Sequence, residues 1–236
     1  TYVGQEIGQF YGWVYKGIAR TQEDLDNNAV QQGANVGDCL YEDISGPDGT
    51  PDGVIDAYDQ TVLGSGLPKV NFGLSTHLEY KGFDLNISTY GVLNYHVSDD
   101  IYNSLNSCYG YGNKEVGMLD ANRWSEDGST YLSSVPRTYA ANNATLAWND
   151  LFSSRKIQNA AYWKIANVEL GYNFPDKWFG GYVNGVRLYV SAQNLYTFTG
   201  YHGYNVDYAG GTFTPGYNFC SFPSARTFMC GLHFTF

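Results

Sequence analysis

The carboxyl-terminal stretch from Pro223 to Phe236 constrains the fold of this chain more than any other segment. From Arg226 onward the residues alternate between two sets, and the apolar set comprises Phe228, Cys230, Leu232, Phe234 and Phe236. A period of two predicts a β-strand with one apolar face. Such a strand at the edge of a soluble domain would promote aggregation, whereas a transmembrane barrel turns the apolar face to lipid and pairs the edges.

The composition agrees with a β-structure and excludes several classes of protein. Aromatic residues make up 17% of the chain and there are 28 glycines, a balance that favours strands, turns and membrane interfaces. No apolar run approaches the roughly 18 residues of a membrane-spanning helix. The net charge of −10 argues against a nucleic-acid partner. The four cysteines lack C-x-x-C spacing, which argues against a zinc site. The sequence leaves open whether two of them form a disulfide.

Four further segments show strand-like alternation or extended composition. Lys69–Leu93 predicts a hairpin that turns at Lys81-Gly82, and each arm has about the 9–11 residues of a transmembrane strand. The other expected strands are Gly8–Ala19, Tyr162–Phe174 and Val186–Phe198.

Between the strands lie long stretches without sustained alternation, and we expect them to be loops. They run from Thr21 to Asp38 (with a short helical turn), from Asn94 to Asn159 and from Tyr201 to Phe222. Loops of this length are uncommon in compact soluble domains and usual on the outer side of bacterial barrels. Five convincing strands cannot close a membrane barrel, which needs at least about eight. The sequence therefore predicts an all-β, antiparallel segment of a larger transmembrane barrel, with long extracellular loops.

One loop has the spacing of an EF-hand calcium site. Between Asp48 and Asp59, carboxylates fall at positions one, five, nine and twelve, and glycine falls at position six. The candidate ligands are Asp48, Thr50, Asp52, the carbonyl of Val54, Asp56 and Asp59. Thr50 and Pro51 depart from the usual pattern, and an acidic turn without metal is the alternative. We find no nucleophile elbow, phosphate loop or catalytic histidine pair, so the sequence predicts no enzyme.

Several motifs in the same order resemble the SusC/RagA-like TonB-dependent transporters of Bacteroidota outer membranes. They are GQEIGQFYGWVYKGI from Gly4, GDCLYEDISGPDGTPDGVID from Gly37, LPKVNFGL from Leu67, YKGFDL from Tyr80, YWKIANVELGYNFP from Tyr162 and VRLYVSAQNLYTFTGY from Val186. The aromatic terminal strand completes the series.

The resemblance implies that residues 1–236 are the carboxyl-terminal part of a barrel of about 22 strands, and that the plug domain and earlier strands lie outside this sequence. It implies import of oligosaccharides or peptides across the outer membrane, driven through TonB. A SusD-like surface lipoprotein would act as the lid, and the preceding barrel strands and membrane lipid would be the other contacts.

Within that resemblance, aromatic loop residues are candidates for contact with the ligand or the lid. They are Tyr109, Tyr111, Trp124, Tyr201 and Tyr204. Packing within the loops is the alternative for each one. Phe236, as an aromatic carboxyl terminus, is the candidate signal for barrel assembly. The competing interpretation of the whole chain is a soluble secreted β-domain that binds carbohydrate through the calcium-type loop.

Overall fold

The computed structural model describes residues 4–108, 112–118, 122–126, 130, 132–138, 148–179, 183, 185–207 and 210–235. The chain divides into two compact units. The first, here the short-element unit, comprises Thr1–Leu67, His96–Gln158 and Ala209–Cys220. The second, here the long-strand unit, comprises Pro68–Tyr95, Asn159–Tyr208 and Ser221–Phe236.

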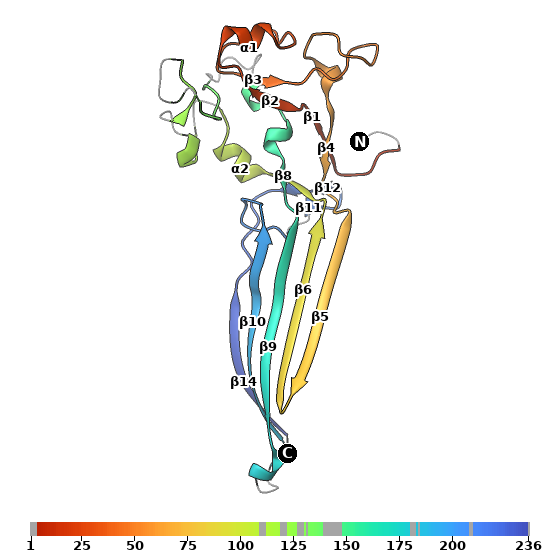
Figure 1. The fold of residues 1–236 in the computed structure, drawn as a ribbon, viewed down its shortest axis with the longest axis vertical. Coiled ribbons are helices and arrows are strands. Elements are labelled where there is room, and N and C mark those ends of the chain that lie inside the picture. The colour runs from red at the N-terminus through yellow and green to blue at the C-terminus, as the bar shows by residue number, and fades with distance from the viewer. Residues whose placement is uncertain are drawn as a thin grey trace. The chain divides into compact units, whose positions relative to one another are not determined.

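The long-strand unit is one antiparallel sheet of five strands, seen side by side in Figure 1. The strands are β5 (Val70–Tyr80), β6 (Phe83–Leu93), β9 (Tyr162–Phe174), β10 (Gly185–Thr199) and β14 (Thr227–Thr235). Their order in the sheet is β14-β10-β9-β6-β5. β5 and β6 form the predicted hairpin, with Lys81 at φ 47° and Gly82 at φ 88° in its turn. A 3₁₀ turn, η7 (Asp176–Trp178), follows β9.

The register of the sheet sorts its side chains into an apolar face and a polar face. Leu78, Leu85, Leu170, Val190 and Cys230 occupy the same row across all five strands. The next row toward the β9 carboxyl end places Glu79 opposite Asp84, on the other face. Each strand therefore uses the two-residue period of the sequence to keep apolar groups on one side.

A bulge in β9 preserves this division near the start of the strand. Asn167 pairs with Ser88 and Ile165 pairs with Thr89, so Ala166 is an extra residue without an opposite partner on β6. Bulges are common next to functional sites because they re-aim side chains. Here the extra residue keeps Lys164 on the polar face, although simple alternation from Leu170 would place it on the apolar one.

The short-element unit consists of brief strands and single helical turns. It contains β1 (Gln9–Gly12), β2 (Tyr15–Ile18), α1 (Gln22–Asp26), β3 (Cys39–Tyr41), η1 (Ala57–Asp59), β4 (Thr61–Ser65), β7 (His96–Asp99), α2 (Asp100–Leu105), η2 (Val116–Met118), η5 (Trp148–Asp150), η6 (Ser154–Lys156), β11 (Gly210–Gly211), β12 (Thr214–Pro215) and β13 (Tyr217–Asn218). β8 (Gln158–Asn159) lies where the chain passes between units. β1 pairs with β4, β2 with β3 and β11 with β12, all antiparallel, and β13 pairs parallel with β7.

A small apolar core and long-range polar contacts hold the short-element unit together. Cys39, Tyr41 and Ile55 form a buried cluster. Beside it the buried Asn149 accepts a hydrogen bond from the Cys39 amide at 2.7 Å and donates to Asp38 Oδ1 at 2.8 Å. Burial raises the pKa of the Cys39 thiol to about 12, so this group stays protonated.

The predicted fold class is confirmed, and the structure refines its details. The expected strand at Gly8–Ala19 is two short strands, β1 and β2, and the expected helical turn within 21–38 is α1. The described residues between Asn94 and Asn159 include no long strand, and those from His96 to Gln158 fold into short elements that belong to one unit with Thr1–Leu67. No helix in the described ranges is long and apolar enough to cross a membrane. All four cysteines are free thiols.

Candidate functional site

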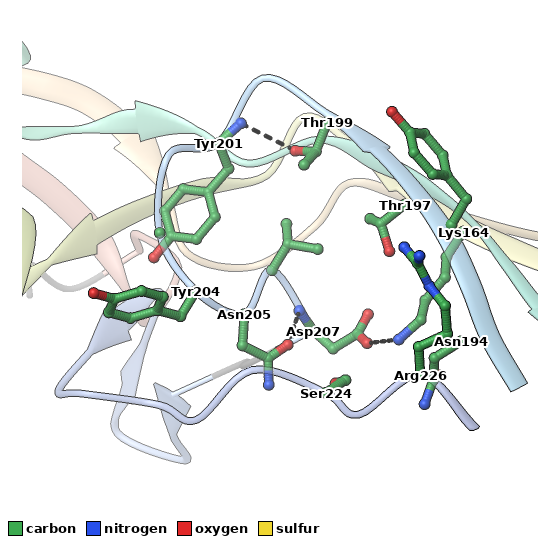
Figure 2. A pocket seen from close by; sticks show the side chains of 13 residues that line it. Lys164, Asn194, Thr197, Thr199, Tyr201, Tyr204, Asn205, Asp207, Ser224 and Arg226 are labelled. Atoms are coloured by element: carbon green, nitrogen blue, oxygen red, sulfur yellow. Dashed lines mark hydrogen bonds and ion pairs between the residues drawn. The ribbon is translucent and has the colours of Figure 1, made fainter.

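A pocket of about 320 Å³ lies on the long-strand unit, where β9 begins and β10 ends (Figure 2). Its walls come from these two strands, from the loop after β10 and from the segment before β14. We call it the Lys164 pocket, and its main lining residues are Lys164, Thr197, Tyr201, Tyr204, Asp207 and Arg226. The volume is at the lower end of the roughly 300–1,000 Å³ of small-molecule sites.

The register places Lys164 and Thr197 opposite each other on the polar face. The neighbouring pair, Trp163 and Phe198, points to the apolar face, where the two rings stack with centroids 5.3 Å apart. The bulge at Ala166 is what allows this arrangement. The pocket therefore opens on the polar side of the sheet, while an aromatic pair covers the other side at the same height.

Lys164 forms a buried ion pair with Asp207 (Figure 2). Only 4% of the Lys164 side chain is exposed, and its Nζ lies 5.9 Å from the centre of the Tyr90 ring. A buried ammonium group requires a counter-charge because its desolvation costs several kcal/mol. Asp207 supplies that charge, so the pair is a structural anchor for the loop after β10.

Local hydrogen bonds shape the loop that carries Asp207. The Tyr201 amide donates to Thr199 Oγ1 at 3.1 Å, and the Asp207 amide donates to Asn205 Oδ1 at 3.0 Å. Side chains of this kind often close short turns by accepting from a backbone amide two residues on.

Burial and the nearby Asp207 charge raise the pKa of Tyr95, just after β6, to about 12. Its phenol is therefore neutral at neutral pH.

Arg226 and three hydroxyl groups are among the unpaired polar groups of the pocket, which also include the buried Oδ1 of Asp207. Within the described part of the chain, the side chains of Arg226, Thr197, Ser224 and Tyr204 make no hydrogen bond or ion pair. Asn194, which has φ 52°, donates through Nδ2 to the Ala225 carbonyl at 2.9 Å. This bond fixes the backbone next to Arg226. The site therefore combines one free guanidinium with several free hydroxyls.

The structure places two of the predicted contact residues in the Lys164 pocket and a third within the other unit. Tyr201 and Tyr204 both line the Lys164 pocket, with Tyr201 7% exposed and Tyr204 67% exposed. Trp124 belongs to the short-element unit and is buried, and a Cβ on Gly37 would lie only 2.5 Å from its ring. Its ring therefore packs inside that unit. Tyr109 and Tyr111 lie outside the described residues, as does Phe236.

Sequence reasoning missed the charged residues of the pocket. One sequence feature draws attention to Lys164: it lies in a strand whose alternation of apolar and polar residues breaks upstream of Val168. Asp207 and Arg226 lie in irregular segments, where no period indicates which way a side chain points. The ion pair spans 43 positions, and it could be found only from the fold.

Two residues of the predicted calcium loop, Asp56 and Asp59, are committed to hydrogen bonds with backbone amides. Asp59 is fully buried and accepts from the amides of Ile44 and Asp56 at 2.8 Å each, and from that of Ser45 at 3.1 Å. Asp56 accepts from the Tyr58 amide at 2.7 Å. These carboxylates fold the loop and cap η1.

The other four candidate ligands, Asp48, Thr50, Asp52 and Val54, are exposed. Asp52 Oδ1 accepts from the Val54 amide at 3.0 Å. Among the residues that the structure describes, no three His, Cys, Asp or Glu side chains are grouped to hold a metal ion. Calcium binding by this loop stays a prediction.

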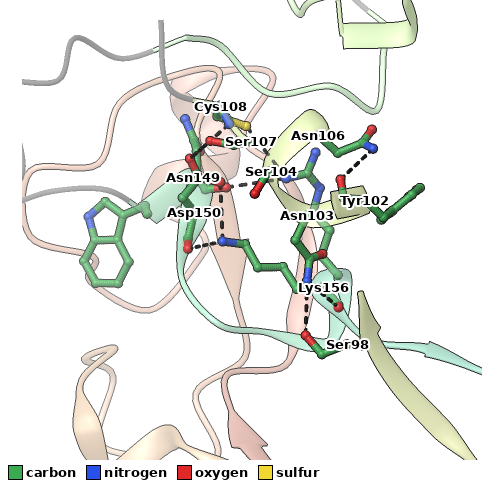
Figure 3. Close-up of polar contacts among 12 residues, drawn as sticks. Ser98, Tyr102, Asn103, Ser104, Asn106, Ser107, Cys108, Asn149, Asp150 and Lys156 are labelled. Carbon is green, nitrogen blue, oxygen red and sulfur yellow. Dashed lines mark hydrogen bonds and ion pairs between the residues drawn. The ribbon is translucent and has the colours of Figure 1, made fainter. Parts of the chain in front are cut away.

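A larger pocket, of about 620 Å³, lies in the short-element unit beside α2. Several of its polar lining residues are engaged in the contacts drawn in Figure 3. Asp150 Oδ2 accepts from Ser107 Oγ and from the Cys108 amide, both at 3.0 Å, and Lys156 Nζ lies 3.4 Å from Oδ1. Asn103 donates to Ser98 Oγ at 3.1 Å. These contacts hold the unit together, so the Lys164 pocket is the better candidate site.

Comparison with curated proteins identifies relatives over almost the whole chain. The TonB-dependent receptors P3 and P26 of Formosa agariphila are 30% and 28% identical and each aligns with 99% of this chain. The TonB-dependent receptor SusC of Bacteroides thetaiotaomicron is 25% identical and aligns with 89% of the chain. The chain spans only 22%, 23% and 21% of these three relatives. No protein-family profile matches.

Solved structures show the same fold. Two structures of the RagAB peptide transporter and importer align with 97% of this chain at TM-scores of 0.73 and 0.71, with 21% identity. This chain covers 22% and 23% of the aligned chains. At this identity the likeness establishes the fold. The resemblance inferred from the sequence motifs is confirmed: the chain is similar, along nearly its whole length, to SusC/RagA-like TonB-dependent receptors.

Proposed function

We propose that this chain is a wall segment, with its attached loops, of an outer-membrane importer of the SusC-like TonB-dependent type. The observation that carries the proposal is the two-faced sheet of the long-strand unit. One face is apolar and exposed, and the other bears ion pairs and hydroxyls. A sheet in water buries its apolar face, whereas a membrane barrel exposes it to lipid and keeps a polar lumen.

The apolar face has the layout of a lipid-facing surface. Leu74, Val190 and Leu232 are 63%, 51% and 58% exposed. Such a broad exposed apolar area is rare on soluble monomers. In a bilayer, lipid would cover these side chains and remove them from contact with water, so the sheet would need no protein partner on this face.

Aromatic rings flank the aliphatic middle of that face. One belt, near the β5–β6 turn, contains Tyr80, Phe83, Tyr172 and Phe174, and the other contains Phe72, Trp163, Tyr196 and Phe198. The rows of Trp163 and Tyr172 are eight ladder positions apart, as are their β6 partners Gly91 and Phe83. At about 3.3 Å per residue and a tilt of about 40°, this spans roughly 20 Å, and the rings themselves extend beyond it toward the edges of the roughly 25 Å apolar band of outer-membrane barrels.

The polar face carries a charge network that would line the lumen. Arg187 donates to Asp84 through Nε at 3.1 Å and through Nη2 at 2.5 Å, and to Glu169 at 2.7 Å. Asn173 donates to Asp84 at 3.0 Å. Lys164 and Asp207 lie on this face too. Water in a lumen would solvate such groups, while lipid would not.

The relatives support the transport role and its partners. SusC and the Formosa agariphila proteins are TonB-dependent receptors, and the solved structures are of a peptide importer. By analogy we propose import of oligosaccharides or peptides across the outer membrane, energised through TonB and assisted by a SusD-like lipoprotein lid. We propose no catalytic step, because binding and passage of the ligand need none.

Fractionation of cells that express the full-length protein tests the proposal. The protein should be extracted from outer membranes only by detergent, and ligand uptake should stop when TonB is deleted. Growth on unrelated small nutrients is the control for general damage. Recovery of the protein as a monodisperse water-soluble species, without detergent, would reject the importer and favour a soluble carbohydrate-binding domain.

A further inference from the structure

We propose that the Lys164 pocket binds a carboxylate group of the imported oligomer through the guanidinium of Arg226. This inference rests on the proposed import function and narrows its ligand to acidic oligomers. The shared chemistry is a carboxylate, which could come from an acidic sugar residue or from the carboxyl end of a peptide.

The charges of the pocket favour an anion. Lys164 and Asp207 neutralise each other in their ion pair. Arg226 then remains as a cation without a carboxylate partner among the described residues. The chain as a whole has a net charge of −10. An unpaired cation in a concave site of such a protein is a local positive region that attracts anionic ligands.

The donors around Arg226 suit a carboxylate that is attached to a polar ligand. A guanidinium offers two parallel N–H groups that match the two carboxylate oxygens. The free hydroxyls of Thr197, Ser224 and Tyr204 can donate to or accept from neighbouring groups of the ligand. The exposed ring of Tyr204 adds an apolar surface beside them. Figure 2 shows Tyr201 and Tyr204 toward one side of the pocket and Arg226 toward the other.

The backbone around the site is fixed before a ligand arrives. Asn194 holds the Ala225 carbonyl, and the paired strand β14 begins at Thr227, directly after Arg226. The Lys164–Asp207 pair anchors the loop after β10. Preorganisation of this kind reduces the conformational entropy that binding costs. Only the Arg226 side chain itself then needs to settle on the ligand.

Binding measurements on the full-length protein in detergent test the inference. The probes are trigalacturonate and its neutral counterpart galactotriose, and trialanine, acetylated at its amino end, and the neutral carboxyl amide of that peptide. Arg226→Gln should raise the Kd for at least one acidic probe about tenfold or more, since a hydrogen bond to a charged group is lost. It should leave the Kd of the neutral counterparts unchanged. Lys177→Gln, which removes an exposed cation after the far end of β9, is the control.

Each outcome decides the matter. Arg226 dependence for trigalacturonate alone identifies an acidic sugar as the source of the carboxylate, and dependence for trialanine alone identifies a peptide. An unchanged Kd for both acidic probes would overturn the inference. Arg226→Lys keeps the charge and removes the paired donors, so it should bind with intermediate affinity even if the glutamine variant folds poorly. TonB-dependent uptake with an unchanged Kd in Arg226→Gln would reject only this inference, whereas a water-soluble protein without TonB-dependent uptake would reject the import function.

Discussion

The two units of this chain are specified in different ways. In the long-strand unit, a repeated alternation of apolar and polar residues sets the strands and their two faces. In the short-element unit, individual polar side chains bond to backbone groups far away in sequence, as Asn149 does with the Cys39 amide across 110 positions. A pattern tolerates many single changes, because each residue contributes a small part. A unit built on single buried contacts should respond sharply to the loss of one.

The largest effect is expected at the ion-pair network of Arg187, Asp84 and Glu169. This network is an exception to the contrast, because it consists of single specific contacts within the long-strand unit. Arg187→Leu leaves Asp84 and Glu169 without their shared cation. Removal of one partner from a buried ion pair costs about 3–5 kcal/mol, and water on the polar face should reduce this to about 3–4. Urea unfolding of the full-length protein in detergent micelles measures the loss. Adding Asp84→Asn should restore part of the stability, and an undiminished stability of Arg187→Leu would contradict the role of the network.

The two faces of the sheet can be compared with a matched pair of arginine substitutions. Val190 and Met229 lie on adjacent strands, are 51% and 44% exposed, and point to opposite faces. Val190→Arg should lower the stability of membrane insertion by about 2–4 kcal/mol, since arginine is costly on a lipid face, while Met229→Arg on the polar face should cost close to zero. Folding into lipid vesicles, followed by gel mobility without heating, measures both. Equal losses of stability in the two variants would mean that the two faces of the sheet do not lie in different environments.

A single side chain should have a large effect in the short-element unit. Asn149→Ala removes the bonds to the Cys39 amide and to Asp38, and leaves both groups buried. We expect a loss of about 2–3 kcal/mol in local stability. Hydrogen exchange of the amides in β3 measures it. Asn113→Ala, at an exposed residue, is the control, and equal exchange in both variants would show that the unit does not depend on this contact.

The smallest effect is expected at the amino end of α1. Asp24 accepts hydrogen bonds from the amides of Arg20 and Thr21, at 2.8 and 2.9 Å, and these bonds lower the pKa of its carboxyl. A lowered pKa in the folded state means that this stabilisation is present above the unfolded pKa and is lost as pH falls through the folded one. Asp24→Ala should destabilise the helix by about 1 kcal/mol at pH 7.

Hydrogen exchange of the α1 amides, measured at pH 7 and at strongly acidic pH, follows that change. The difference between Asp24→Ala and the unsubstituted protein should shrink at the acidic pH. Glu23→Ala, at the neighbouring exposed carboxylate, should have little effect at either pH. A difference that persists unchanged in acid would show that the carboxylate charge does not cause the stabilisation.

Much of the sheet could be predicted from the sequence, because a period of two encodes both strand and face. The hairpin at Lys69–Leu93 and the three later long strands follow from it. The pairing of β6 with β9, across the whole segment from Asn94 to Ala161, could not be predicted, because alternation does not identify a distant partner. The short-element unit and the charges of the Lys164 pocket were out of reach for the same reason: their partners are brought together by the fold.

The extra residue at Ala166 has a consequence for how this strand can change in evolution. Beyond it, Trp163 and Lys164 keep their faces only because the bulge absorbs one position. Deletion of a single residue at the bulge would straighten the strand and leave both side chains where they are. The same deletion between Asn167 and Phe174, where the pairing is continuous, would exchange the apolar-face and polar-face sets of side chains on one side of the gap. Length variation among relatives of this chain should therefore concentrate at the bulge.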